Sequence, residues 1–173
     1  RNTSPCIAYA SMKIFSLNPD ANLVIAPSDH VITDEKKFQQ AVAKGLEFTA
    51  KNNSLLTIGI HPSRPDTGYG YIQFNGDDSS EEFKISKVKT FTEKPDFELA
   101  KTFLLSGDFL WNAGIFVWQV KTILKAFEQF QPEMYELFDN EKQHYNTNKE
   151  KEAIHKIYPL CTNISIDFAI MEK

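Results

Sequence analysis

The chain has 173 residues and a formal net charge of −4. This length predicts one domain, since domains usually contain about 100–200 residues. The hydrophobic content of 42% is enough to bury a sizeable core. The excess of acidic residues provides no broad basic surface, so we expect neither nucleic acid nor an anionic membrane as a partner. No apolar run reaches the roughly 20 residues of a membrane-spanning helix, and no signal peptide is visible.

The two cysteines, Cys6 and Cys161, have neither a CxxC arrangement nor the spacing of a metal site. We therefore expect two free thiols, buried or half-buried. Unpaired thiols are typical of a reducing compartment, so we expect a cytoplasmic protein.

The first third of the chain alternates helices with apolar strands. We expect a helix over 3–17, a strand over 23–26, a helix over 34–51 and a strand over 55–60. Thr3 or Ser4 can cap the first helix with a side-chain oxygen, and Thr33 or Asp34 can cap the second. This alternation is typical of parallel strands joined by crossover helices, and it predicts a layered α/β sheet.

The rest of the chain is less regular. The predicted elements are a Pro/Gly-rich loop over 62–70, a strand at 71–74, a turn at 76–78 with an exposed stretch to 82, and a returning strand over 83–91. They continue with a helix between Asp96 and Gly107, a strand over 109–118, amphipathic helices over 120–156, a strand at 164–168 and a helix start at 168–173. The chain begins with Arg1 rather than Met and ends inside a predicted element, so we expect a piece of a longer protein.

Two isolated acidic residues are candidates for metal binding. Asp29 follows the carboxyl end of a buried strand, where open α/β sheets bind their ligands, and it is well placed to hold Mg²⁺ against a phosphate. Asp167 lies in an apolar run, where a carboxylate needs a partner or a cation. The alternatives are a turn or helix cap for Asp29 and a helix cap for Asp167. Sequence spacing alone does not bring the two together.

Three further motifs place free backbone or polar groups beside apolar strands. Gly70 belongs to a Gly-rich run that allows close approach of a ligand, although such runs are also common in hairpins. Glu93 and Lys94 end a strand and offer an acceptor for sugar hydroxyls and a charge for phosphate, or else a solvated ion pair. Asn112 lies inside an apolar stretch and must be satisfied by backbone or by ligand hydroxyls.

Six motifs follow one another along the chain. They are RNTSP at 1–5, PSDH at 27–30, PDTGYGYI at 65–72, FTEKP at 91–95, WNAGIF at 111–116 and SIDFAIMEK at 165–173. With this series the chain resembles, from end to end, the mannose-1-phosphate guanylyltransferase branch of the sugar nucleotidyltransferase family. The acid after a strand and the EKP-like element are shared broadly in that family. TGYGYI, WNAGIF and SIDFAIMEK carry the likeness to the branch.

The resemblance implies a Rossmann-like, glycosyltransferase-A-like α/β fold, with a layered mixed sheet flanked by helices and truncated at both ends. Residues 1–173 would form one partial domain, with nucleotide-side βα units in 1–61 and a sugar-phosphate side in 62–173. The implied enzyme joins GTP and α-D-mannose 1-phosphate into GDP-mannose and diphosphate with Mg²⁺ as cofactor. Asp29 and Asp167 would be its catalytic metal ligands.

The matching motifs also imply how the sugar phosphate is bound. Gly70, Glu93 and Asn112 would line the mannose. Tyr69 would shape the same wall, and Lys94 would face the sugar phosphate.

The implied nucleotide side is incomplete. Asn2 and Thr3 would lie near the nucleoside, and Ser28 near the ribose or the phosphates. The family also opens with a strand and a Gly-rich, GTRLWPLSR-like loop that cradles the triphosphate, and no such sequence occurs in these 173 residues. We therefore expect negligible turnover by the chain alone, and an exposed sheet edge that favours self-association as a homo-oligomer.

Three other interpretations stay open. The enzyme could use another sugar 1-phosphate or another nucleotide, because guanine is inferred from the resemblance alone. The chain could belong to a non-catalytic, nucleotidyltransferase-like binding or regulatory subunit. The motifs could also be coincidental in an unrelated α/β fold.

Overall fold

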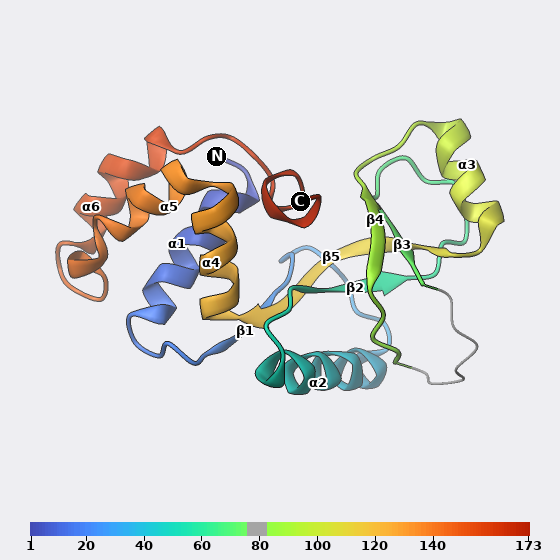
Figure 1. Cartoon of the computed structure of the whole chain (residues 1–173), viewed down its shortest axis with the longest axis horizontal. Coiled ribbons are helices and arrows are strands. Elements are labelled where there is room, and N and C mark those ends of the chain that lie inside the picture. Colours follow the sequence, from blue (N-terminus) through green and yellow to red (C-terminus); the bar gives the residue numbers. More distant parts are fainter. Residues whose placement is uncertain (76–82) are drawn as a thin grey trace.

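A computed structural model describes residues 1–75 and 83–173 of the chain (Figure 1). The predicted turn at 76–78 and the exposed stretch to residue 82 lie outside these described residues. A five-stranded sheet runs through the centre of the molecule, with helices packed on it, so the expected layered α/β architecture is confirmed. The strands are β1 (Asn22–Ile25), β2 (Leu56–Ile60), β3 (Tyr71–Phe74), β4 (Val88–Thr92) and β5 (Phe109–Gln119).

The long strand β5 organises the sheet, because β1, β2 and β3 all pair with it. Val117 pairs with Val24 of β1 on one edge and with Leu56 of β2 on the other. Trp111 is flanked in the same way by β3 and β2. Strands β1 and β3 therefore follow one another along one edge of β5, while β2 occupies the opposite edge. Strand β4 extends the sheet beyond β3.

Every strand pairing among the described residues is antiparallel, so no two of the predicted parallel strands are hydrogen-bonded to each other. Strands β1 and β2 run in the same direction, as expected for strands joined by the crossover helix α2 (Glu35–Lys51), but β5 lies between them. An alternating helix–strand pattern indicates the direction of successive strands. It does not reveal that a later strand separates them.

The other helices lie mainly at the two ends of the sheet (Figure 1). They are α1 (Thr3–Phe15), α3 (Phe97–Ser106), α4 (Val120–Phe130), α5 (Pro132–Asp139) and α6 (Glu150–Ile157), with short 3-10 turns at Lys142–His144 and Tyr158–Leu160. The predicted caps Asp34 and Asp96 accept hydrogen bonds from the backbone at the starts of α2 and α3. Gly107 ends α3 in the left-handed conformation, as predicted. Helix α1 is capped by Asn2 instead of Thr3 or Ser4, because the Asn2 side chain accepts from the Thr3 N–H.

Two hydrophobic cores share β5. The larger core packs the carboxyl half of β5 against α1, α4 and α5, and its largest buried side chains include Trp118, Phe127 and Phe138. The smaller core lies under α3 and consists of Tyr71, Ala100, Phe109 and Trp111. Burial of such aromatic side chains is the main source of stability at both ends.

Residues 164–168 do not form the predicted strand, whereas the helix start predicted at 168–173 agrees with a helical turn in the structure. Residues Asp167–Met171 form a π-helical turn that buries Ala169 and Ile170 in the larger core. The preceding backbone is tied to the start of α1, because Ser4 N donates to the Ile164 carbonyl at 3.2 Å. The alternation of apolar and polar residues in ISIDF suggested a strand, but α1 takes the hydrogen bonds that a sheet partner would have used. The strand predicted over 83–91 is also shorter, since β4 begins at Val88.

Glu150 connects α1 with α6. Its carboxylate accepts from Tyr9 Oη, from Lys13 Nζ at 2.6 Å and from Asn146 N at 2.7 Å. The Lys13 and Tyr9 hydrogen bonds lower the pKa of Glu150 to about 2, so this carboxylate is ionised through the neutral range. The cluster is a structural tie between two helices of the larger core.

Both cysteines are free thiols, as predicted, but Cys6 is exposed and only Cys161 is buried. No helix in the described ranges is long and apolar enough to cross a membrane.

Candidate functional site

A gap in the pairing along one edge of β5 leaves the part of the strand that carries Asn112 without a strand partner on that edge. Strand β1 ends with Ile25 opposite Phe116, and β3 begins with Tyr71 opposite Trp111. Among the described residues, no strand pairs with 112–115 on this edge. The same stretch is irregular on the β2 side, where the register shifts between Thr57 and Gly59. Bulges of this kind redirect side chains and are common beside functional sites.

Gly114 makes the bulge possible. Its φ of +66° lies in the left-handed region, which most residues other than glycine adopt only at a cost. A Cβ built at Gly114 would lie 3.7 Å from Pro27 Cγ, so the loop that leaves β1 runs past the bulge. That loop carries Ser28 and Asp29.

Asn112 is buried in the gap, and its amide orientation is fixed by its neighbours. Its Oδ1 accepts from Gly114 N at 3.1 Å and from Thr57 Oγ1 at 2.8 Å. Its Nδ2 donates to Asp167 Oδ1 at 2.9 Å. A backbone N–H can only donate, so Oδ1 must face Gly114 and Nδ2 must face the carboxylate.

Gly70 brings Glu93 against Asn112. The Gly70 carbonyl accepts from Asn112 N at 2.7 Å, which places the start of β3 beside the bulge. A Cβ at Gly70 would lie 2.5 Å from Glu93 Oε2 and 3.5 Å from Asn112 Cβ. The absence of a side chain at Gly70 is therefore what allows the Glu93 carboxylate to occupy its place.

Lys94 supplies the positive charge of the cluster. Its Nζ lies 2.8 Å from Glu93 Oε1, and the Lys94 side chain is 62% exposed while that of Glu93 is only 8% exposed. The hydrogen bond to Glu93 raises the pKa of Lys94 above its usual value. Lys94 also has a φ of +46°, an uncommon conformation for a non-glycine residue and one that is enriched at functional sites.

Asp167 is the most perturbed acid of the cluster. Burial raises the pKa of Asp167, the Glu93 charge raises it further, and the Asn112 hydrogen bond and the Lys94 charge oppose these effects. Two carboxylates thus share one ammonium group, which leaves an excess of negative charge. Such an arrangement suits a cation or a ligand rich in hydroxyl groups.

The structure therefore brings together five of the predicted site residues: Gly70, Glu93, Lys94, Asn112 and Asp167. Gly70 directly precedes β3, Glu93 and Lys94 directly follow β4, Asn112 lies in β5, and Asp167 begins the C-terminal turn. Their roles in binding or catalysis stay predictions.

The other predicted residues surround this cluster or lie apart from it. Thr3 Oγ1 accepts from Ile166 N at 2.9 Å, so the start of α1, with Asn2, borders Asp167. Ser28 and Asp29 are exposed in the turn after β1. Within the described part of the chain, no group of three or more His, Cys, Asp or Glu residues is arranged to hold a metal ion.

Tyr69 contacts a different side chain. Its ring centroid lies 5.0 Å from that of Trp111, and the Arg64 guanidinium lies 5.3 Å from the centre of the Trp111 ring. Arg64 also forms a 2.6 Å ion pair with Asp66 in the same loop. These contacts fix the loop that leads to Gly70.

Sequence reasoning missed Thr57. Its hydroxyl holds the Asn112 amide from the opposite edge of β5, but Thr57 is surrounded by apolar residues in a predicted strand. A polar residue inside that run was the available signal, and a threonine in a strand is ordinary enough to hide it.

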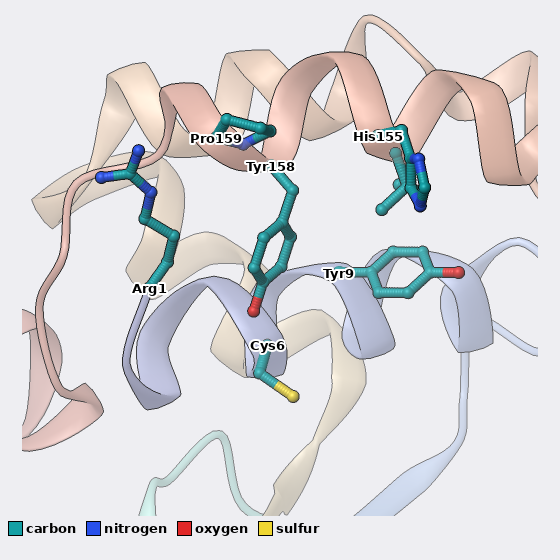
Figure 2. A pocket seen from close by; sticks show the side chains of 7 residues that line it. Arg1, Cys6, Tyr9, His155, Tyr158 and Pro159 are labelled. Atoms are coloured by element: carbon teal, nitrogen blue, oxygen red, sulfur yellow. The ribbon is translucent and has the colours of Figure 1, made fainter.

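A cavity lies elsewhere in the molecule (Figure 2). It has a volume of about 670 Å³ and is formed between α1 and the segment 154–159. Cys6 and Tyr9 border it from α1, and His155 and Tyr158 border it from the other side. None of the five clustered residues lines this cavity, and no group of charged side chains like that around Asp167 is gathered there.

Comparison with known proteins identifies the class to which this fold and cluster belong. Residues 1–155 match the nucleotidyl transferase family, and the chain belongs to that family. In sequence it is 37% identical to the alginate biosynthesis protein AlgA of Pseudomonas aeruginosa. It is 33% identical to a mannose-1-phosphate guanylyltransferase of Klebsiella pneumoniae. Both alignments cover 100% of this chain but only 36% and 37% of the two relatives, so the chain spans little more than a third of their length.

Solved structures agree with this assignment. A Thermus thermophilus protein described as a mannose-1-phosphate geranyltransferase superimposes with a TM-score of 0.83 at 25% identity, covering 100% of this chain and 48% of that one. A Helicobacter pylori protein described as mannose-6-phosphate isomerase superimposes with a TM-score of 0.77 at 26% identity, covering 100% of this chain and 65% of that one. The chain thus has a nucleotidyltransferase-like fold.

Proposed function

We propose that the protein containing this chain transfers a guanylyl group from GTP to α-D-mannose 1-phosphate, giving GDP-mannose and diphosphate. The observation that carries the proposal is the convergence of Gly70, Glu93, Lys94, Asn112 and Asp167 at the gap beside β5. The name of the Klebsiella pneumoniae relative supports the choice of substrates.

In the proposed reaction, a phosphate oxygen of mannose 1-phosphate attacks the α-phosphorus of GTP. The new P–O bond forms as the bond between the α-phosphorus and the bridging oxygen breaks, and diphosphate leaves. Little covalent chemistry is asked of the protein, so positioning and charge neutralisation provide most of the catalysis. The Glu93 carboxylate accepts hydrogen bonds from sugar hydroxyls, and the backbone at Gly70 allows the sugar to approach closely. The exposed ammonium of Lys94 binds the sugar phosphate.

We propose Mg²⁺ as the cofactor, because the chemistry of Asp167 fits this ion. Asp167 is a hard oxygen donor whose charge is disfavoured by burial and by Glu93, so a cation would stabilise it. Asp167 and Asp29 are the residues proposed to hold the ion. When bound, Mg²⁺ supplies positive charge to the phosphate oxygens.

The test is GDP-mannose formation by the full-length protein, measured with GTP, mannose 1-phosphate and Mg²⁺, beside Asp167→Ala and the 173-residue chain alone. We expect activity only in the unmodified full-length protein. The Asp167→Ala variant loses a proposed Mg²⁺ ligand, and these 173 residues contain no Gly-rich triphosphate loop. An inactive full-length protein that carries such a loop would overturn the guanylyl assignment. A panel of other sugar 1-phosphates and nucleoside triphosphates would then identify the substrates or leave a non-catalytic binding role.

Self-association is a second, separate proposal about the chain alone. Val24 on β1 and Ile60 on β2 are 40% and 51% exposed at sheet edges, and exposed apolar edges favour pairing between copies. Light scattering that shows a clean monomer at all concentrations would contradict it.

A further inference from the structure

We propose that Thr57 is a positioning residue, whose hydroxyl holds the Asn112 amide in the orientation that serves the sugar phosphate. The kinetic part of this proposal rests on the proposed function. The geometric part rests on the described contacts alone. Thr57 lies on β2, across β5 from the edge where Gly70 and Glu93 meet Asn112.

The bulge in β5 is what brings Thr57 within reach of Asn112. Thr57 pairs with Phe116 and Gly59 pairs with Asn112, so one residue of β2 lies opposite three residues of β5. In a regular antiparallel ladder, a step of two residues on β2 corresponds to a step of two residues on β5. Here the step from Thr57 to Gly59 corresponds to a step of four residues, from Phe116 to Asn112. The two extra residues of β5 form the bulge, and Asn112 Oδ1 lies 2.8 Å from Thr57 Oγ1 beside it.

Two groups, the Gly114 N–H and the Thr57 hydroxyl, donate hydrogen bonds to Asn112 Oδ1. Gly114 N determines which end of the amide faces the bulge, because an N–H cannot accept. Thr57 supplies the shorter of the two bonds to Oδ1, at 2.8 Å against 3.1 Å. Without the Thr57 hydroxyl, the buried Oδ1 keeps only the longer bond, and the side chain gains freedom to turn.

The orientation matters because of what it leaves for a ligand. The Asn112 Nδ2 carries two hydrogens, and one is donated to Asp167 at 2.9 Å. Within the described part of the chain, no acceptor is paired with the second hydrogen. This N–H is therefore the donor that Asn112 offers to a sugar hydroxyl, and Thr57 sets its direction.

The test compares Thr57→Val, Thr57→Ser and the matched control Thr49→Val in the full-length protein. Thr49 is also a buried threonine, but its hydroxyl donates to the Gly45 carbonyl within α2. We expect Thr57→Val to raise KM for mannose 1-phosphate by about fivefold with little change in kcat, the effect of weakening one hydrogen bond used in substrate binding. Thr57→Ser and Thr49→Val should keep the original KM.

A double-mutant cycle identifies the route of the effect. If Thr57 acts through Asn112, then Thr57→Val should change KM no further in an Asn112→Ala background. An unchanged KM in Thr57→Val, an equal rise in Thr57→Ser, or an effect that persists without Asn112 would overturn the proposal.

A spectroscopic readout separates this proposal from the proposed function. In protein labelled with ¹⁵N-asparagine, the side-chain signals of Asn112 are assigned by their loss in Asn112→Ala. They should shift in Thr57→Val and remain in place in Thr49→Val. If the unmodified protein makes no GDP-mannose, the guanylyl assignment fails, whereas unshifted Asn112 signals would refute the role of Thr57.

Discussion

Gly70→Ala tests the central claim about the cluster, that Glu93 occupies the space a side chain at position 70 would fill. The added Cβ would lie 2.5 Å from Glu93 Oε2, while ordinary contact begins at 3.4 Å. The carboxylate must therefore retreat by about 0.9 Å, and a misplacement of that size can reduce catalysis by about 100-fold. The moving atom ends a flexible side chain, so we expect only about 1 kcal/mol of lost stability, the low end for overpacking.

The assay is GDP-mannose formation by the full-length protein, with thermal unfolding measured on the same samples. Gly107→Ala is the control, because Gly107 has a φ of +77° and no atom within 4 Å of a built Cβ. Its backbone strain should cost about 1–2 kcal/mol without crowding the cluster. A Gly70→Ala variant that keeps kcat/KM within about twofold of the original would contradict this role of Gly70, because so small a change does not fit a displaced site.

Three further substitutions probe charge. Asp167→Asn should raise the unfolding temperature at pH 7 but abolish turnover, because the folded-state pKa of Asp167 is raised and its ionisation opposes folding. Lys94→Gln should raise KM for the sugar phosphate about tenfold, since a charged hydrogen bond is lost. Glu150→Gln should cost about 2 kcal/mol at neutral pH. Its deficit should shrink as pH falls from 4.5 toward about 2, where the original carboxylate becomes protonated and loses the same stabilisation.

Each of these expectations has a clear contrary result. For Asp167→Asn, the contrary result is an unfolding temperature lower than that of the original protein. For Lys94→Gln, the contrary result is an unchanged KM for the sugar phosphate. A stability deficit of Glu150→Gln that stays constant down to pH 2 would show that the carboxylate charge is not what connects α1 and α6.

Local chemistry made parts of the fold predictable. Asp34, Asp96 and Gly107 act on their own helix ends, so their effect is contained in a few neighbouring residues. The positions of most strands followed from apolar runs. Pairing did not, because the partner of β1 lies at residues 116–119, almost a hundred positions away. The segment 164–168 was misassigned for a similar reason, since its hydrogen bonds go to the start of α1.

The same distinction applies to the site. Motifs singled out Gly70, Glu93, Lys94, Asn112 and Asp167, but only the tertiary structure shows that they are neighbours. Burial and the charge of Glu93, which lies 74 positions earlier in the chain, together raise the pKa of Asp167. Thr57 could not be selected from sequence, because its contact with Asn112 arises beside a register shift that no local pattern records.

The position of β5 in both hydrophobic cores has a consequence for how the molecule unfolds. Phe109 and Trp111 belong to the core under α3, whereas Phe116 and Trp118 belong to the larger core. Unfolding of either core therefore removes packing contacts from β5, and β5 is part of the other core as well. We expect the amide hydrogens of β5 to exchange with solvent more slowly than those of the other strands, and we expect proteases to release no stable half-molecule.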